Sequence, residues 1–198
     1  ELIKIKRNLS YRFLFIPETI GAITWLSKNE DKVGNIKHGL VATCLGDSGK
    51  MTYKRSRDGN NTIDQVVTEV LKESQEPFEI IDFFPTGSDE RQFCSPGFNL
   101  PIGSLMRTRY TKFLEYHTSG DDLDFVQPKF LKNSFEKYYN VIRILEEQIE
   151  PDKSNTNKSN KNKSIKNKSI KKESENVYVN IISKCEPHLG KRGLYRNV

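Results

Sequence analysis

Short apolar runs alternate with amphipathic segments over most of this chain, and this alternation restricts the folds open to it. Four runs are apolar enough to be buried strands: residues 11–16, 38–45, 78–84 and 100–106. Three segments have apolar residues at the spacing of a helix face: residues 18–28, 62–74 and 127–150. Strands and helices that alternate in this way are typical of a mostly parallel central sheet flanked by helices. The sequence therefore predicts an α/β fold.

Most side chains capable of chemistry lie within residues 87–125, on either side of the apolar run 100–106. One polar cluster, Ser88-Asp89-Glu90-Arg91, precedes this run, and a second, which includes Tyr116-His117 and three aspartates, follows it. Ligands of open α/β sheets gather in the loops at strand ends. We therefore expect a functional site in this part of the chain.

The composition changes abruptly at residue 151. Residues 151–176 are rich in Lys, Asn and Ser and hold eight lysines against three acidic residues, a charge of +5 out of the net +6. The rest of the chain is thus nearly neutral, so we do not expect it to bind nucleic acid. A segment with so few apolar residues cannot offset its own conformational entropy, so we predict a disordered linker at 151–176. Residues 177–198 are predicted to begin a separate C-terminal segment.

The cysteines and the apolar runs bear on the cellular setting. Cys44, Cys94 and Cys185 are odd in number and far apart, which favours a reducing, cytoplasmic location over a disulfide framework. No run approaches the roughly 18 apolar residues of a membrane span, so no membrane association is expected. A homo-oligomer is left open by the sequence.

Three motifs, in this order, resemble those of the zinc-dependent aminopeptidase superfamily, which includes two-zinc aminopeptidases and glutaminyl cyclases. They are FIPETIG at 15–21, SDERQF at 88–93 and YHTSGD at 116–121. The longer strings IPETIG, GSDERQFCSPG and EYHTSGDDLDFV are similar to an uncharacterised bacterial branch of aminopeptidase-like proteins with a C-terminal winged helix. LGKRGLY at 189–195 resembles the ending of that branch. The resemblance implies a zinc-exopeptidase-like fold in which residues 1–150 form the C-terminal half of the catalytic domain.

The resemblance also implies roles for six residues. Glu18 matches the general base that takes a proton from water, and Tyr116 matches a donor to the tetrahedral oxyanion. His117 matches a metal ligand. A substrate-binding role is implied for Asp89, Glu90 and Arg91. The expected activity is hydrolysis of an amide bond next to a free amine, in a peptide or an amide-bearing small molecule.

Three departures from the superfamily pattern change this expectation. Thr19 stands where the two-zinc enzymes have a second Glu, and Thr43 stands where they have an Asp ligand. The ligands expected upstream of FIPETIG are absent from this chain. We therefore expect one zinc ion rather than two, and a partial domain that is inactive alone.

Simpler interpretations of the same residues stay open. Glu18 can be a first-turn acid favoured by the helix dipole, and His117 an ordinary hydrogen-bonded histidine. Asp89, Glu90 and Arg91 can form an exposed salt-bridged loop. The alternative function is a catalytically degenerate pseudoenzyme, or a regulatory module with a winged-helix partner segment.

Overall fold

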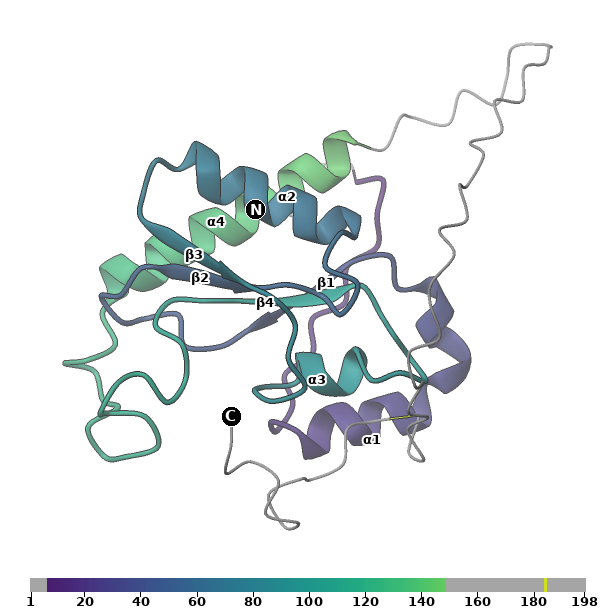
Figure 1. Cartoon of the computed structure of the whole chain (residues 1–198), viewed down its shortest axis with the longest axis horizontal. Helices are drawn as coiled ribbons and strands as arrows, with labels where there is room; N and C mark the ends of the chain where they lie inside the picture. The colour runs from purple at the N-terminus through teal and green to yellow at the C-terminus, as the bar shows by residue number, and fades with distance from the viewer. Residues whose placement is uncertain (1–6, 149–183, 185–198) are drawn as a thin grey trace, which may run out of the picture.

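The computed structural model describes residues 7–148 and residue 184, and its elements alternate along the chain (Figure 1). In chain order they are α1 (Ile20–Lys28), η2 (Glu30–Asn35), β1 (Gly39–Ala42), β2 (Met51–Lys54), α2 (Thr62–Glu73), β3 (Phe78–Ile81), α3 (Glu90–Phe93), β4 (Ile102–Met106) and α4 (Pro128–Glu147).

The four strands form one mixed, mostly parallel sheet in the order β1-β4-β2-β3. β1 pairs parallel with β4, with Gly39 opposite Ile102, and β2 pairs parallel with β3. The two pairs meet at an antiparallel junction between β2 and β4. Because β1 and β4 run the same way, the loops that follow them leave from the same edge of the sheet. This arrangement confirms the predicted α/β fold class.

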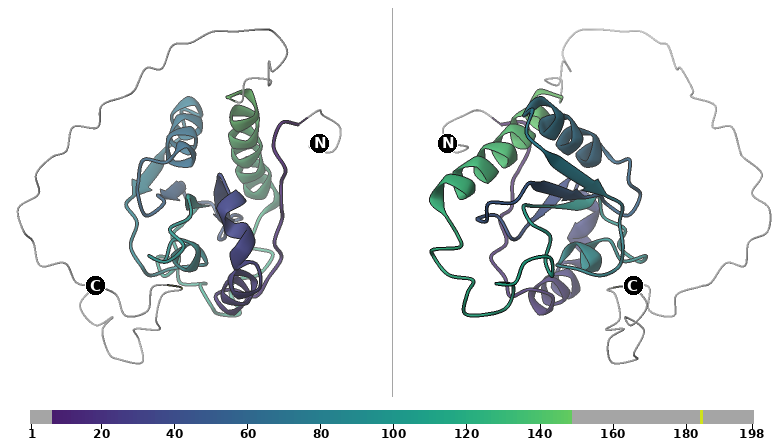
Figure 2. Two further views of the ribbon diagram at one scale, coloured as in Figure 1. Left: turned by 90° about the vertical axis from the view of Figure 1, so that its right-hand side faces the viewer. Right: turned by 60° about the vertical axis from the view of Figure 1, so that its left-hand side comes forward.

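Helices cover both faces of the sheet, and each face has its own hydrophobic core (Figures 1 and 2). On one face, α2 and α4 pack on β2 and β4 around a cluster that includes Tyr53, Val67 and Leu105. On the other face, α1 and α3 pack on the start of β4 through Leu26, Phe93 and neighbouring residues. The sheet is therefore the middle of three layers.

One buried carboxylate fixes the start of α2. Asp64 and Asn61 form a capping box at the first turn. The same carboxylate accepts hydrogen bonds from the Tyr53 hydroxyl (2.8 Å) and from the Ser56 backbone N–H (2.8 Å). The cap thus also attaches the helix to the end of β2.

The predicted strand at 11–16 is wrong. This segment passes the edge of the sheet without pairing, and it exposes Phe13 (63%) and Phe15 (95%). It is attached to the end of α4 instead, where the Tyr11 hydroxyl donates to Glu146 Oε1 at 2.7 Å. An apolar run becomes a strand only where a neighbour accepts its backbone hydrogen bonds, and none of the strands within residues 7–148 does so.

The other predicted elements form with shorter bounds, and three elements were not predicted: β2, α3 and η2. The predicted linker at 151–176 and segment at 177–198 lie outside the described residues, apart from Lys184. Within the described part of the chain, no helix is both long and apolar enough to cross a membrane.

Candidate functional site

A pocket of about 290 Å³ opens at the edge of the sheet where β1 and β4 end. Its wall comes from the turn before α1, the loop after β1, the long loop between β4 and α4, and one residue of α4. This edge is where parallel strands present their carboxyl ends, the usual place for a ligand in an open α/β sheet.

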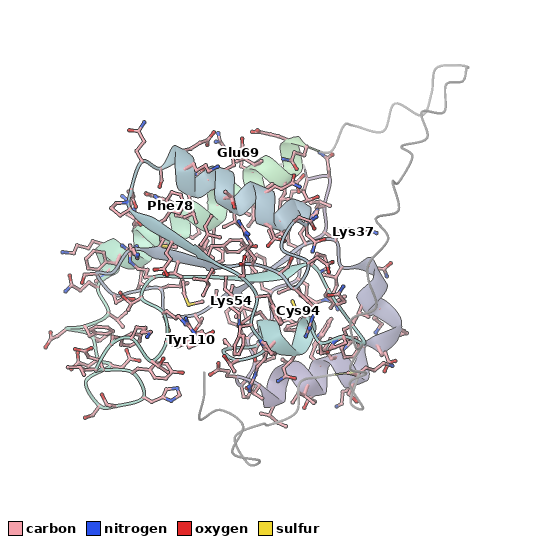
Figure 3. The ribbon with its side chains drawn as sticks, viewed as in Figure 1. Lys37, Lys54, Glu69, Phe78, Cys94 and Tyr110 are labelled. Carbon is pink, nitrogen blue, oxygen red and sulfur yellow. The ribbon has the colours of Figure 1, made fainter. Side chains whose placement is uncertain are left out.

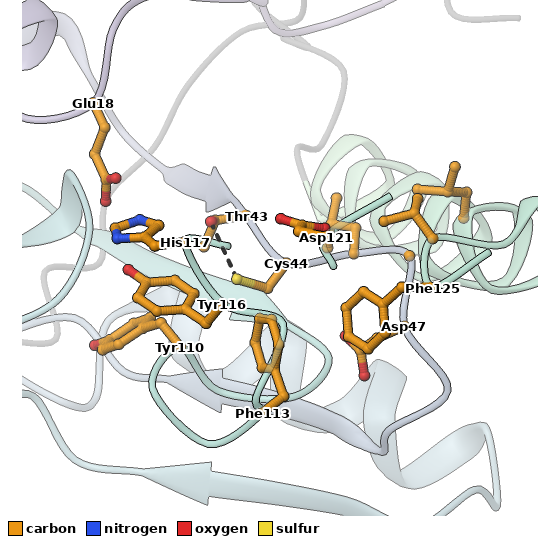
Figure 4. A pocket seen from close by; sticks show the side chains of 14 residues that line it. Glu18, Thr43, Cys44, Asp47, Tyr110, Phe113, Tyr116, His117, Asp121 and Phe125 are labelled. Atoms are coloured by element: carbon orange, nitrogen blue, oxygen red, sulfur yellow. Dashed lines mark hydrogen bonds between the residues drawn. The ribbon is translucent and has the colours of Figure 1, made fainter. Parts of the chain in front are cut away.

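The pocket brings together three residues that are distant in sequence. Glu18, Tyr116 and His117 all line it. Figure 4 shows the Glu18 carboxylate directed toward the His117 ring and the Tyr116 hydroxyl. The Tyr116 and His117 rings stack with their centroids 3.9 Å apart. Burial raises the pKa of Tyr116 above its usual 10.0, and the nearby charge of Glu18 acts in the same direction. Tyr116 is therefore a protonated hydrogen-bond donor at neutral pH.

The loop after β1 forms the floor of the pocket. Thr43 and Cys44 lie side by side there, with Oγ1 and Sγ 3.6 Å apart. Burial raises the pKa of the Cys44 thiol, and the charge of Asp47 acts in the same direction. Cys44 is therefore a neutral thiol at physiological pH, which makes it a poor nucleophile.

The electrostatic character of the lining is acidic. Glu18, Asp47 and Asp121 contribute carboxylates, whereas none of the lining residues is Lys or Arg. Asp47 is buried and accepts the backbone N–H groups of Gly49 (2.7 Å) and Thr108 (3.2 Å), so it also holds the loop in place. Glu18 and Asp121 are exposed. The pocket therefore favours a cationic group such as a protonated amine.

Glu18 enters the pocket from a tight turn of unusual conformation. Thr19 has φ 63° and ψ −66°, and the Ile20 N–H donates to the Glu18 carbonyl at 2.7 Å. These angles are those of the γ-turn with positive φ, which is rarer and more strained than the inverse γ-turn. Such a conformation costs a non-glycine residue on the order of 1–3 kcal/mol. Gly21 lets the chain fold back closely, because a Cβ there would lie 2.7 Å from the Ile16 Cβ.

Asp89 and Arg91 lie against this turn. Asp89 Oδ1 accepts the Thr19 N–H at 2.6 Å, and Arg91 donates to Thr19 Oγ1 at 3.1 Å. Burial raises the pKa of Asp89, and the hydrogen bond from Thr19 opposes that effect. Neither residue lines the pocket, although both were expected to bind substrate.

Glu90 occupies a different environment from the other predicted residues. It is 0% exposed, and its carboxylate Oε1 lies 2.8 Å from Lys54 Nζ, which is 1% exposed (Figure 3 labels Lys54). Lys54 also donates to the Thr86 carbonyl at 2.5 Å. In this structure Glu90 joins α3 to β2 and does not reach the pocket.

Aromatic side chains form a wall that sequence reasoning missed. Tyr110, Phe113 and Phe125 line the pocket, and the two phenylalanine rings stack with centroids 5.3 Å apart. Their spacing within an irregular loop follows neither the period of a helix nor that of a strand, so no pattern indicated a common surface. The wall provides an apolar surface beside the acidic groups.

The donor set is too small for a complete zinc site. A structural zinc ion in a protein is held by four side-chain ligands, and a catalytic zinc ion by three side-chain ligands and a water molecule. Among residues 7–148 and 184, no three His, Cys, Asp or Glu side chains are grouped so that they could hold a metal ion. His117, at the pocket rim, can supply one ligand, and the others would have to come from outside the described residues.

Comparisons with known sequences identify a family and a relative of this chain. A family model described as "Domain of unknown function (DUF4910)" matches residues 1–148. A "Putative polysaccharide biosynthesis protein with aminopeptidase-like domain" from Clostridium acetobutylicum is 47% identical over 197 residues, which are 100% of this chain and 39% of the relative. The chain thus spans about two fifths of that relative's length.

Two solved structures resemble the described fold. The crystal structure of a "putative peptidase" from Clostridium acetobutylicum matches with a TM-score of 0.71 and 49% identity, over 77% of this chain and 38% of that one. The zinc aminopeptidase BSAP from Bacillus subtilis matches with a TM-score of 0.54 and 11% identity, over 66% of this chain and 34% of that one. The second likeness concerns the fold alone.

Proposed function

Because this chain belongs to the DUF4910 family and has an aminopeptidase-like fold, we propose that it forms part of a hydrolase that cleaves an amide bond next to a free amine. The observation that supports this most is the convergence of Glu18, Tyr116 and His117 in one acidic pocket. The acidic lining suits the protonated amine, and the aromatic wall suits an apolar side chain next to that amine.

Each of the three residues has a role that its chemistry allows. The Glu18 carboxylate accepts a proton from the water that attacks the amide carbon and returns it to the leaving amine. The Tyr116 hydroxyl donates a hydrogen bond to the oxyanion of the tetrahedral intermediate. His117 would hold a zinc ion only together with ligands from outside the described residues. Bound zinc would supply Lewis-acid polarisation and a lower pKa for water.

The alternative is a catalytically degenerate module that binds a partner without hydrolysing it. Two residues favour this alternative. Thr19 and Thr43 carry hydroxyls at positions where the two-zinc enzymes are expected to have carboxylate ligands. Thr43 lies on the pocket floor, so a neutral group replaces a charge at the site itself.

An assay of the full-length gene product separates these two functions. We expect hydrolysis of aminoacyl p-nitroanilides with a free amine, and at least tenfold slower hydrolysis of the N-acetylated counterparts. Removing the metal with a chelator should abolish the activity, and adding zinc should restore it. Equal rates on both substrates, or no hydrolysis with zinc bound, would contradict the proposed hydrolase and favour the binding module.

A further inference from the structure

We propose that Asp89 and Arg91 are positioning residues, which hold Thr19 in its strained turn and thereby fix the direction in which Glu18 enters the pocket. This inference rests on the proposed function, because it gives the two residues a task only if Glu18 acts as the base. It replaces the substrate-binding role that the sequence suggested for them.

The backbone on both sides of Glu18 is constrained. On one side, the ring of Pro17 fixes its own φ. On the other side, Thr19 has a positive φ that a threonine adopts only when its surroundings impose it. A relaxation of Thr19 to an ordinary negative φ would rotate the peptide that follows Glu18. The carboxylate would then leave its place above Tyr116 and His117 (Figure 4).

The contacts that impose this conformation both come from the start of α3. The carboxylate of Asp89 accepts the Thr19 N–H at 2.6 Å, a charge-assisted hydrogen bond, and Arg91 binds the Thr19 hydroxyl at 3.1 Å. The backbone and the side chain of Thr19 are thus both held, by residues 70 and 72 positions away in sequence.

The α3 helix is itself held firmly in place. Phe93 and Cys94, two and three residues after Arg91, pack in one core with Ala22 and Leu26 of α1. The Cys94 thiol, whose pKa burial raises to about 11, lies 3.0 Å from the Ile102 carbonyl of β4. The start of α1 and the segment from Asp89 to β4 are therefore packed together in one core.

A purely structural role is the competing interpretation. Thr19 is the N-cap residue of α1 and makes no side-chain cap of its own, so the Asp89 carboxylate could simply stabilise the start of that helix. The two interpretations differ in what they predict for catalysis. Loss of a structural cap lowers the free energy of unfolding. Loss of a positioning residue lowers kcat, and does so only while Glu18 is present to be positioned.

The test is a double-mutant cycle in the full-length gene product between Asp89→Ala and Glu18→Gln. We expect Asp89→Ala to lower kcat by about 10- to 100-fold with little change in KM, because a small misplacement of a catalytic group is costly. In the Glu18→Gln background the same substitution should have almost no further effect on kcat. Asp89→Asn, which keeps an oxygen acceptor for the Thr19 N–H, should restore most of the activity.

The control variant is Asp31→Ala, which removes an exposed acid from η2 and should leave kcat unchanged. An NMR measurement reads the contact without an assay: the Thr19 amide proton should move upfield in Asp89→Ala and stay in place in Asp31→Ala. Undiminished kcat in Asp89→Ala, or losses that multiply in the double variant, would overturn the positioning role while leaving the proposed function intact. Full activity in Glu18→Gln alone would instead overturn both.

Discussion

Charged residues that are neighbours in the sequence of this protein can lie in quite different environments. Asp89 and Glu90 are adjacent in sequence, but one binds a turn beside the pocket and the other is fully buried against Lys54. Successive side chains at a helix start point about 100° apart, so they cannot all face one cavity. A polar cluster in a sequence therefore indicates a region of interest but not which member of it reaches a ligand.

The proposed role of Tyr116 as a hydrogen-bond donor to the oxyanion can be tested by a single substitution. Replacing it with Phe should lower kcat by about 100-fold, because an oxyanion donor is lost, and should change KM by less than about threefold. Since the pKa of Tyr116 is raised above 10.0, its ionisation should not limit the wild-type rate below pH 10. Steady-state kinetics between pH 6 and 10 check both points.

Tyr139→Phe, which alters a ring stacked on Phe135 of α4, is the matched control. An equal effect of both variants on kcat would remove Tyr116 from the mechanism.

At the scale of elements, the most consequential contact is the ion pair that joins β2 to α3. Lys54 and Glu90 are both essentially inaccessible to solvent, and burial lowers the pKa of Lys54 although Glu90 opposes this. Lys54→Met should destabilise the fold by about 3–5 kcal/mol, because it leaves the Glu90 charge buried without its partner.

Urea unfolding measures this effect, and an exposed pair provides the comparison. Lys50 and Glu79 lie 2.9 Å apart with about half of each side chain exposed. Lys50→Met should therefore change stability by less than about 1 kcal/mol. If Lys54→Met cost no more than Lys50→Met, the buried pair would contribute little, and the account of α3 as a firmly held element would be wrong.

The elements also show what periodicity can and cannot predict. The helices α1, α2 and α4 and the strands at 38–45, 78–84 and 100–106 were predictable, because their apolar faces match the cores that they fill. β2 was not, because its fully buried segment Met-Thr-Tyr-Lys is half polar and depends on partners outside the strand, Asp64 and Glu90. The run 11–16 has the composition of a strand, but pairing depends on a neighbour that composition does not reveal.

At the scale of the whole molecule, the loop between α2 and β3 is attached to α4. Glu76 accepts hydrogen bonds from Asn133 (2.9 Å) and Lys137 (3.0 Å). Burial pushes the pKa of Glu76 upward, but the bonds from Lys137 and Asn133 outweigh it, so the folded-state pKa lies below the usual value. Folding therefore favours the ionised carboxylate.

The pH dependence of stability follows from this sign. The contribution of Glu76 is fully present above its unfolded-state pKa of about 4.3 and is lost as pH falls through the lower folded-state value. Because its side chain is 42% exposed, we expect less than about 1 kcal/mol. Wild type should be more stable than Glu76→Gln at pH 7, and this difference should shrink toward pH 3. Urea unfolding at both values measures it, and a difference that stays constant would contradict the assignment.

The position of the pocket was predictable in part at this scale. A site was expected within residues 87–125, and the loop after β4 lines the pocket, but the cluster at 88–91 does not. The parallel pairing of β1 and β4 places the loops after both strands at one edge of the sheet. Glu18 and His117 converge there because α1 and the β4–α4 loop flank that edge. The aromatic wall and the buried role of Glu90 depend on side-chain directions that only the folded structure supplies.

The central claim is that Glu18 acts as a general base in this pocket, and kcat of the zinc-loaded Glu18→Gln variant of the full-length gene product tests it most directly. We predict a 10²- to 10⁴-fold lower kcat on an aminoacyl p-nitroanilide, with zinc content and KM close to those of wild type. Glu30→Gln, an exposed acid in η2, should match wild type. Wild-type kcat in the Glu18→Gln variant would contradict the account.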